Sequence, residues 1–399
     1  MKRTKLIISL VCAVVMLVSL NVTTFALAGT ENKEEYFLFA ADVIEDYYRN
    51  RENCEFNQLT SKIDNAALDL LEAKIEMTRY KEDKLDIVRN NYDVEVIPVL
   101  EDEWVYSNNS VRMKLQVLRT WDYDDCNEQT SSSELLTVLV SNDDNNFIIE
   151  ECYFDGECTR FGTLDIDYMD SLKEKTANNF LNDYVNEYKE QCDILAEEYS
   201  LKNKNTVSVN KIEDNTRTVG YFDREAMRDW ARNNYNKATP VSSSSSISYY
   251  DFSEITNSYD CTNFASHAIL AGGATMHDDG ASGITGTNQW YFRNINNRSS
   301  SWSGVDQLKQ FLTRSNPGSN NVGPYAEVKE LTYANAYYGD LVQFHNGTIW
   351  RHTTVVTSYT GGQIRVTGRT NDYIFDDNIL PEERVATEIR LVHLINNHS

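Results

Sequence analysis

One stretch of the C-terminal half decides how that half folds. It reads Asp260-Cys261-Thr262-Asn263-Phe264-Ala265-Ser266-His267-Ala268-Ile269-Leu270-Ala271-Gly272-Gly273. The apolar residues from Phe264 to Ile269 recur at helical spacing, and the Gly272-Gly273 pair supplies a C-terminal stop. Asp260 is a preferred N-cap residue, so the pattern predicts a helix whose first turn holds Cys261.

A cysteine in the first turn of a helix has a chemical advantage. The unpaired backbone N–H groups and the helix dipole favour an anion there, and the pKa of a free thiol, ordinarily about 8.5, falls at such a position. Cys261 is also the only cysteine of residues 201–399, which hold all six histidines of the chain. These features favour a nucleophile, and a buried structural cysteine is the alternative.

A base is expected on a sheet beside this helix. The segments 338–344 and 351–357 alternate as two strands around Asn346-Gly347, which predicts a β-hairpin with His352 at the start of the returning strand. A third strand is expected over 363–370. A nucleophilic cysteine on a helix, a histidine on a strand and a polar group on the next strand make the papain-like arrangement.

From about Val219 to the end, roughly 180 residues, the chain resembles an amidase domain family of exported bacterial proteins, related to CHAP and papain-like cell-wall hydrolases. The resemblance is carried by an ordered series of pieces: Tyr221-Phe222-Asp223-Arg224 with Trp230 and Ala231, Asp260 to Ser266, Gly272-Gly273, Ser301-Trp302, Gly339-Asp340-Leu341-Val342-Gln343 and His352 to Thr357.

The resemblance implies that Cys261 is the nucleophile and His352 the general base of an amide hydrolase. Asp260, Asn263 and Trp302 are the candidates for supporting the substrate or the oxyanion. Core packing is the default expectation for Trp290 and Trp302, and lining of a substrate groove is the alternative. His267 is expected to be a packing or surface residue, and His277 to lie in a polar loop. No metal and no cofactor are expected.

One departure from the family falls on the third strand. Where the family often has a His-Thr pair and a nearby Asp, this chain has Gly368-Arg369-Thr370-Asn371-Asp372. Arginine has no acceptor with which to orient an imidazole. The orienting acceptor is therefore expected from Asn371 or Asp372, between which the sequence does not choose, or the site is a Cys-His dyad.

Charge divides the chain into two parts. Residues 29–200 carry 41 Asp and Glu against 16 Lys and Arg, whereas residues 201–399 carry 20 against 18. The acidic balance, −24 over the whole chain, argues against a nucleic-acid-binding protein, because phosphate contacts need a basic surface. Two domains are the simplest interpretation.

The acidic part reads as helices followed by a sheet. Helical periodicity covers 34–49 and about 58–90, with Ser61 as the expected cap, and strand-like stretches follow at 94–100, 104–107, 111–121, 135–140 and 147–154. This order predicts an α+β domain over 29–163, with a cystatin-like or nuclear-transport-factor-like cone architecture. A connecting helix over 164–200, a linker over 201–218 and the amidase domain over 219–399 complete the predicted order.

The first 28 residues have the pattern of an export signal. Lys2, Arg3 and Lys5 precede an apolar run from Leu6 to Leu20, and Ala26 and Ala28 fit a cleavage site after Ala28. An uncleaved membrane anchor is the alternative. Export makes disulfides among the six remaining cysteines an open question, with Cys152 and Cys158 as one pair that a turn could bring together.

The whole sequence thus predicts an α+β protein, secreted or at the cell surface. Its predicted activity is hydrolysis of peptide or amide bonds, with peptidoglycan or a peptide as the substrate. A noncatalytic wall-binding or adhesion module with a degenerate amidase fold, and a transglutaminase-like acyl transferase, remain as alternatives.

Overall fold

The computed structural model describes residues 33–50, 59–107, 109–124, 126, 128–144, 146–155, 180–204, 222–237, 260–314, 322–371, 373–384 and 386–398. In these residues the protein is mixed α+β, with seven α-helices and a large, mainly antiparallel sheet. The predicted signal peptide, Cys54, Cys158, linker residues 205–218 and Asp372 lie outside them.

The N-terminal part begins with helices and continues with strands, in the order that its sequence predicts. The helices are α2 (Lys33–Arg49) and α3 (Asn65–Leu85). Asp64 caps α3 by accepting the backbone N–H of Ala66 at 3.0 Å, so the expected cap at Ser61 is wrong by three residues. The strands are β1 (Asn90–Val99), β2 (Val105–Ser107), β3 (Ser110–Asp122), β4 (Thr130–Asp143) and β5 (Asn146–Asp155), and the short helix η3 (Glu101–Glu103) lies between β1 and β2.

Helix α5 (Phe180–Lys204) closes this part of the molecule. It packs on α3 through a cluster of buried residues that includes Leu70, Met77, Val185 and Cys192. None of the four cysteines in the described residues forms a disulfide. Burial raises the pKa of the Cys192 thiol to about 11, so this thiol stays protonated at neutral pH.

The C-terminal part contributes four α-helices and all the remaining strands of the described residues. The helices are α6 (Arg224–Asn234), α7 (Cys261–Ala271), α8 (Ser300–Ser303) and α9 (Val305–Leu312). The long strands are β9 (Gly323–Lys329), β10 (Leu341–His345), β11 (Trp350–Ser358), β12 (Arg365–Arg369), β13 (Phe375–Ile379) and β14 (Glu388–His398). The strands β6 (Ile284–Thr285), β7 (Phe292–Asn294) and β8 (Asn297–Ser299) form a small separate sheet, and η6 (Thr360–Gly362) and η7 (Pro381–Glu383) are single turns.

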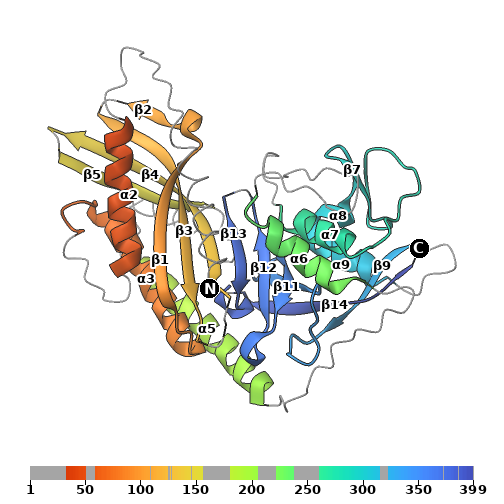
Figure 1. The fold of residues 1–399 in the computed structure, drawn as a ribbon. Helices are drawn as coiled ribbons and strands as arrows, with labels where there is room; N and C mark the ends of the chain where they lie inside the picture. The colour runs from red at the N-terminus through yellow and green to blue at the C-terminus, as the bar shows by residue number, and fades with distance from the viewer. Residues whose placement is uncertain are drawn as a thin grey trace, which may run out of the picture.

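The two parts share one continuous sheet. Its order is β1-β3-β4-β13-β12-β11-β10-β14-β9, with β2 and β5 paired to β3 and β4 off this path. The junction is the antiparallel pair β4–β13, in which Ser133, Ser132 and Ser131 lie opposite Phe375, Asp376 and Asp377. In Figure 1 the strands of the N-terminal part and those of the C-terminal part lie side by side in this sheet.

The two helical layers cover opposite faces of this sheet. On one face, the Tyr48 hydroxyl of α2 donates to Glu134 of β4, and Asp376 lies on the same side because its carboxylate accepts from Ser132 at 2.8 Å. On the other face, Arg232 of α6 pairs with Asp377, the next residue of β13. Because neighbouring strand residues point to opposite faces, α2 and α6 are on different sides of the sheet. No helix among the described residues combines the length and hydropathy needed to span a bilayer.

Candidate active site

Helix α7 lies buried against the sheet, with Cys261 as its first residue. From Cys261 to Leu270 each residue of the helix is buried, and the backbone N–H of Asp260 donates to the carbonyl of Thr370 at 2.8 Å. Asp260 occupies the expected N-cap position, but its carboxylate makes no capping bond to the helix. The side chain has other partners, and these join the start of α7 to its surroundings.

A chain of buried polar groups runs behind Cys261. Asn263 donates from Nδ2 to Oδ1 of Asp260 at 2.9 Å, and its Oδ1 accepts from the indole Nε1 of Trp302 at 2.7 Å. All three side chains are buried. The structure therefore joins the three residues predicted to support the substrate or oxyanion, and it uses their polar atoms to hold the first turn of α7.

Arg369 completes this chain from β12. Its Nε lies 3.3 Å from Oδ2 of Asp260, and both side chains are fully buried. Its Nη1 donates to two backbone carbonyls: that of Asn234, the last residue of α6, and that of Lys237, three residues beyond it. The arginine that departs from the family pattern thus ties β12, α6 and the start of α7 together.

The sulfur of Cys261 lies at the start of β11. Sγ is 3.8 Å from the carbonyl oxygen of Arg351 and 3.8 Å from Oγ1 of Thr262. Thr262 in turn meets Thr353 of β11, with 3.2 Å between the two hydroxyl oxygens. The nucleophile candidate is 2% exposed, so the helix and strand around it nearly exclude water.

His352 is next to Arg351 in the chain, but its imidazole lies on the other face of β11. Thr353 faces α7, whereas His352 is paired with Phe344, whose ring centroid is 5.9 Å from its own. Among the described residues, neither ring nitrogen of His352 has a hydrogen-bond partner. The sulfur of Cys261 therefore lies near the backbone carbonyl of Arg351, the residue before His352, but it makes no hydrogen bond with the imidazole of His352.

The far face of the sheet encloses this imidazole. Burial, together with the positive charge of Arg384, holds the pKa of His352 well below its usual range. Gly368 of β12 lies close to β11: a Cβ there would be 2.7 Å from Cγ2 of Thr354, and 3.6 Å, an ordinary contact distance, from Nε2 of His352. Asp376 is opposite Gly368 in the sheet and pairs with Arg384.

Asn371 and Asp372 are the two residues predicted to orient the imidazole of His352, and the structure describes only the first of them. Oδ1 of Asn371 accepts the backbone N–H groups of Tyr373 at 2.8 Å and Ile374 at 2.9 Å, so this side chain closes a turn between β12 and β13 and does not contact the ring of His352. Asp372 lies outside the described residues. Its predicted role stays a prediction.

The other candidate residues lie in the core or away from Cys261. His267 is buried among aromatic rings, with Trp230 and Trp302 beside it, and burial lowers its pKa to about 3. Trp290 and Trp302 are fully buried, their ring centroids 4.7 Å apart, as in the core-packing alternative. In the part of the chain that the structure describes, no three His, Cys, Asp or Glu side chains are grouped so that they could hold a metal ion.

The sequence did not single out Arg384, whose charge acts on His352, or its ion-pair partner Asp376. Both stand in stretches with no recognisable motif, and Asp376 comes to lie opposite Gly368 through the pairing of β13 with β12. Gly368 is a local signal of close approach between strands, because a glycine inside a strand often marks it, and here the close group is Thr354 of β11.

Comparison with known protein families gives one match. Residues 221–390 match the sequence model of a family described as "Putative amidase domain". No curated protein and no solved structure matches the chain. The match covers the region that contains α6 to α9, the strands from β9 to β13 and both Cys261 and His352. The comparison thus supports an amidase-domain family for residues 221–390.

Proposed function

We propose that the protein is an exported cysteine-dependent amide hydrolase with Cys261 as its nucleophile. The observation that carries the proposal is the place of Cys261: it opens a buried helix of a region that matches an amidase family. The first turn of a helix stabilises a thiolate, which is the reactive form of cysteine. The family match indicates amide hydrolysis in general, and the cysteine mechanism is the finer part of the proposal.

The proposed reaction has two steps. His352 takes the proton of the Cys261 thiol, the resulting thiolate attacks the amide carbonyl to form a thioester, and the same proton passes from His352 to the nitrogen of the amine that leaves. A water molecule, which His352 deprotonates, then attacks the thioester and releases the carboxylic acid and the thiol. The backbone N–H of Cys261 is the proposed oxyanion donor, because Cys261 is the first residue of α7.

This mechanism requires His352 to reach the sulfur. The β10–β11 pairing has a register shift between Phe344 and His345, directly beside His352. A one-residue change of register reverses the face to which each side chain points. We therefore include in the proposal a local rearrangement at the start of β11 that turns His352 toward Cys261 when the substrate binds.

The proposed substrate and location rest on the signal-like pattern of the first 28 residues and on the family resemblance. An export signal cleaved after about Ala28 would deliver the protein to the cell surface or beyond, where peptidoglycan offers peptide and muramyl amide bonds. A papain-like or CHAP-like fold for residues 219–399, and a cone-like fold for 29–163, belong to the same proposal.

The test is cleavage of peptidoglycan by the mature protein. Wild type, Cys261→Ala and His352→Ala are incubated with purified peptidoglycan, and the released fragments are analysed by mass spectrometry for new amine and carboxyl ends. Cys192→Ala is the matched control, because it removes another buried cysteine, which lies on α5 and packs against α3. Cleavage by wild type and Cys192→Ala, with none by the other two, is the expected result. No new ends from wild type would refute the hydrolase on this substrate.

The separation of His352 from Cys261 favours a second candidate. A noncatalytic wall-binding module with a degenerate amidase fold needs no contact between these side chains. It predicts that wild type and Cys261→Ala sediment equally with insoluble peptidoglycan and release no fragments from it. The same incubation therefore discriminates between the two functions.

A further inference from the structure

We propose that Arg369 is a positioning residue for Cys261, which neutralises the buried carboxylate of Asp260 so that the first turn of α7 can hold a thiolate. This inference rests on the proposed function of Cys261 and deepens it. It gives a role to the residue at which the chain departs from the family pattern.

The geometry makes Arg369 the cation for this carboxylate. Its Nε is 3.3 Å from Oδ2 of Asp260, and the side chains of both residues have no exposed surface. Oδ1 of the same carboxylate is taken by Nδ2 of Asn263 at 2.9 Å. The guanidinium is itself fixed, because it donates to the carbonyl of Lys237 beyond α6. The pair is thus held from both sides and does not depend on solvent.

Charge explains why this pair matters for the neighbouring sulfur. Asp260 immediately precedes Cys261, and an unpaired carboxylate so close to a thiol opposes its ionisation. With Arg369 present, the pair is neutral as a whole, and the backbone N–H groups of the first turn act on the sulfur without this opposition. Removal of either partner changes the local charge by one unit, in opposite directions.

Other charged or titratable groups lie on the elements that pack against Cys261. Arg351 and His352 are on β11, while Asp260 and Arg369 are on the cap of α7 and on β12. Arg351 presents its carbonyl oxygen to the sulfur, and the imidazole of His352 lies on the other face of the strand. Substitution of Arg369 or Asp260 therefore tests the effect of this ion pair on the ionisation of the Cys261 thiol.

The test is a direct titration of the Cys261 thiol in the full mature chain. Thiolate absorbs near 240 nm, so the absorbance of each variant is recorded against pH and corrected with the same variant carrying Cys261→Ala. That subtraction removes the other cysteines. The variants are Arg369→Gln, Asp260→Asn, the double variant and Arg369→Lys.

Opposite shifts are expected from the two single substitutions. In Arg369→Gln the carboxylate of Asp260 loses its cation, and at a pH below the thiol pKa the fraction of Cys261 present as thiolate should fall about tenfold. In Asp260→Asn the guanidinium of Arg369 loses its anion, and this fraction should rise by a similar factor. The double variant and Arg369→Lys return close to wild type, because each keeps the pair neutral. A merely structural role moves the melting temperature and does not produce shifts of opposite sign.

Arg232→Gln is the matched control, since it breaks another Arg–Asp pair, with Asp377, on the same helical face of the sheet. It should leave the titration of Cys261 unchanged. Equal titration curves for all variants, or shifts of the same sign in Arg369→Gln and Asp260→Asn, would overturn the proposal. Should Arg369→Gln fail to fold, Asp260→Asn and Arg369→Lys still decide it. Absence of peptidoglycan cleavage by wild type counts against the proposed function alone, because the titration needs no substrate.

Discussion

The N-terminal and C-terminal parts of the sheet differ in the side chains that they bury. The N-terminal core, between α2, α3 and strands β1 to β5, consists almost wholly of apolar side chains such as Leu115, Val138 and Ile149. In the C-terminal part, fully buried polar groups stand among the apolar ones, including Asp260, Asn263 and Arg369. Buried polar groups cost stability unless each has a partner, so the C-terminal core depends on paired polar contacts as well as on apolar packing.

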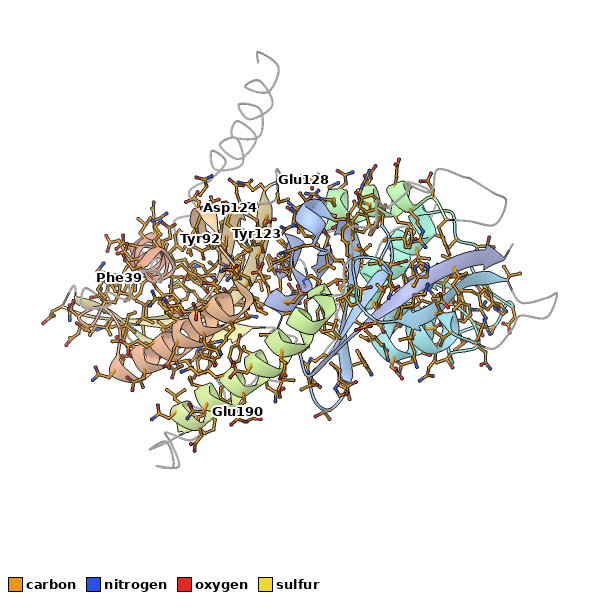
Figure 2. The ribbon with its side chains drawn as sticks, turned by 90° about the horizontal axis from the view of Figure 1, so that it is seen from below. Phe39, Tyr92, Tyr123, Asp124, Glu128 and Glu190 are labelled. Carbon is orange, nitrogen blue, oxygen red and sulfur yellow. The ribbon has the colours of Figure 1, made fainter. Side chains whose placement is uncertain are left out.

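Figure 2 shows where these parts meet. Tyr92, Tyr123, Asp124 and Glu128 lie beside the junction, whereas Phe39 lies at the N-terminal end and Glu190 on α5. Ion pairs cross the junction, among them Arg232 with Glu128 and Arg89 with Glu383. The helices of the two parts thus enclose cores on opposite faces of one connected sheet.

The largest effect on the free energy of unfolding is expected in the core of the C-terminal part, where buried polar groups bond to apolar-packed side chains. Trp302 is fully buried and donates to Asn263, so Trp302→Ala should lower the free energy of unfolding by about 3–5 kcal/mol. Trp302→Phe keeps most of the packing and leaves Oδ1 of Asn263 without its donor, which should cost about 1–3 kcal/mol. Urea unfolding followed by tryptophan fluorescence and circular dichroism measures both.

If Trp302→Phe proved as stable as wild type, the polar chain behind Cys261 would not contribute to stability, and the contrast between the two cores would fail. The N-terminal control is Leu115→Ala, which removes apolar volume without leaving any polar atom unpartnered.

The next effect tests whether the junction makes one cooperative unit. Asp376 accepts from Ser132 of β4 and pairs with Arg384, and it is buried. Asp376→Ala leaves the arginine without this partner and should cost about 3 kcal/mol. Because Asp376 lies on the strand that joins the two parts, the unfolding curve should also separate into two transitions.

Differential scanning calorimetry resolves these transitions. Asp143→Ala, at the exposed far end of β4, is the control and should leave a single peak in place. A single peak for Asp376→Ala, shifted as a whole, would show that the two cores remain coupled without this contact.

A smaller effect concerns pH and falls on the C-terminal part. His352 and His267 have pKa values lowered by burial, to about 3 for His267, while the unfolded chain titrates near the ordinary value of about 6.5. The unfolded state therefore binds more protons below about pH 6.5, so stability is complete above this pH and is lost as the pH falls.

Each histidine should contribute about 1.4 kcal/mol per pH unit below about pH 6. Replacement of His267 by Phe, which cannot take up a proton, should flatten the slope by this amount in urea titrations between pH 6 and 4.5. An unchanged slope would mean that His267 is accessible and charged in the native state.

The elements of both parts were predictable because they depend on local patterns. Helix α7, the β10–β11 hairpin and the N-terminal strands follow from periodicity and turn residues that lie close together in the sequence. The site residues Asp260, Asn263 and Trp302 were brought together by the fold, although their mutual hydrogen bonds required a structure.

The relation between the two parts was not predictable from local patterns. Strand β4 was expected to begin at Leu135, and it begins at Thr130. Its polar Ser131, Ser132 and Ser133 pair with β3 on one side and, on the other, with β13, a strand more than 200 residues away. The face taken by His352 was equally hidden. His352, Thr353 and Thr354 are all polar and all buried, so no alternation of apolar residues fixes the orientation of β11 there.

The smallest effect is expected at the surface of the N-terminal part. Lys189 of α5 pairs with Glu76 of α3 at 2.5 Å, and the carboxylate side chain is 56% exposed. Exposed ion pairs contribute about 0.2–1 kcal/mol, and salt screens them, so Lys189→Ala should lower the free energy of unfolding by no more than this. Val185, which is buried against α3, is the matched position on the same helix, and Val185→Ala should cost more. Urea unfolding at low and high salt compares the two. If Lys189→Ala were the more destabilising at high salt, charge and not apolar packing would hold α5 to the N-terminal part.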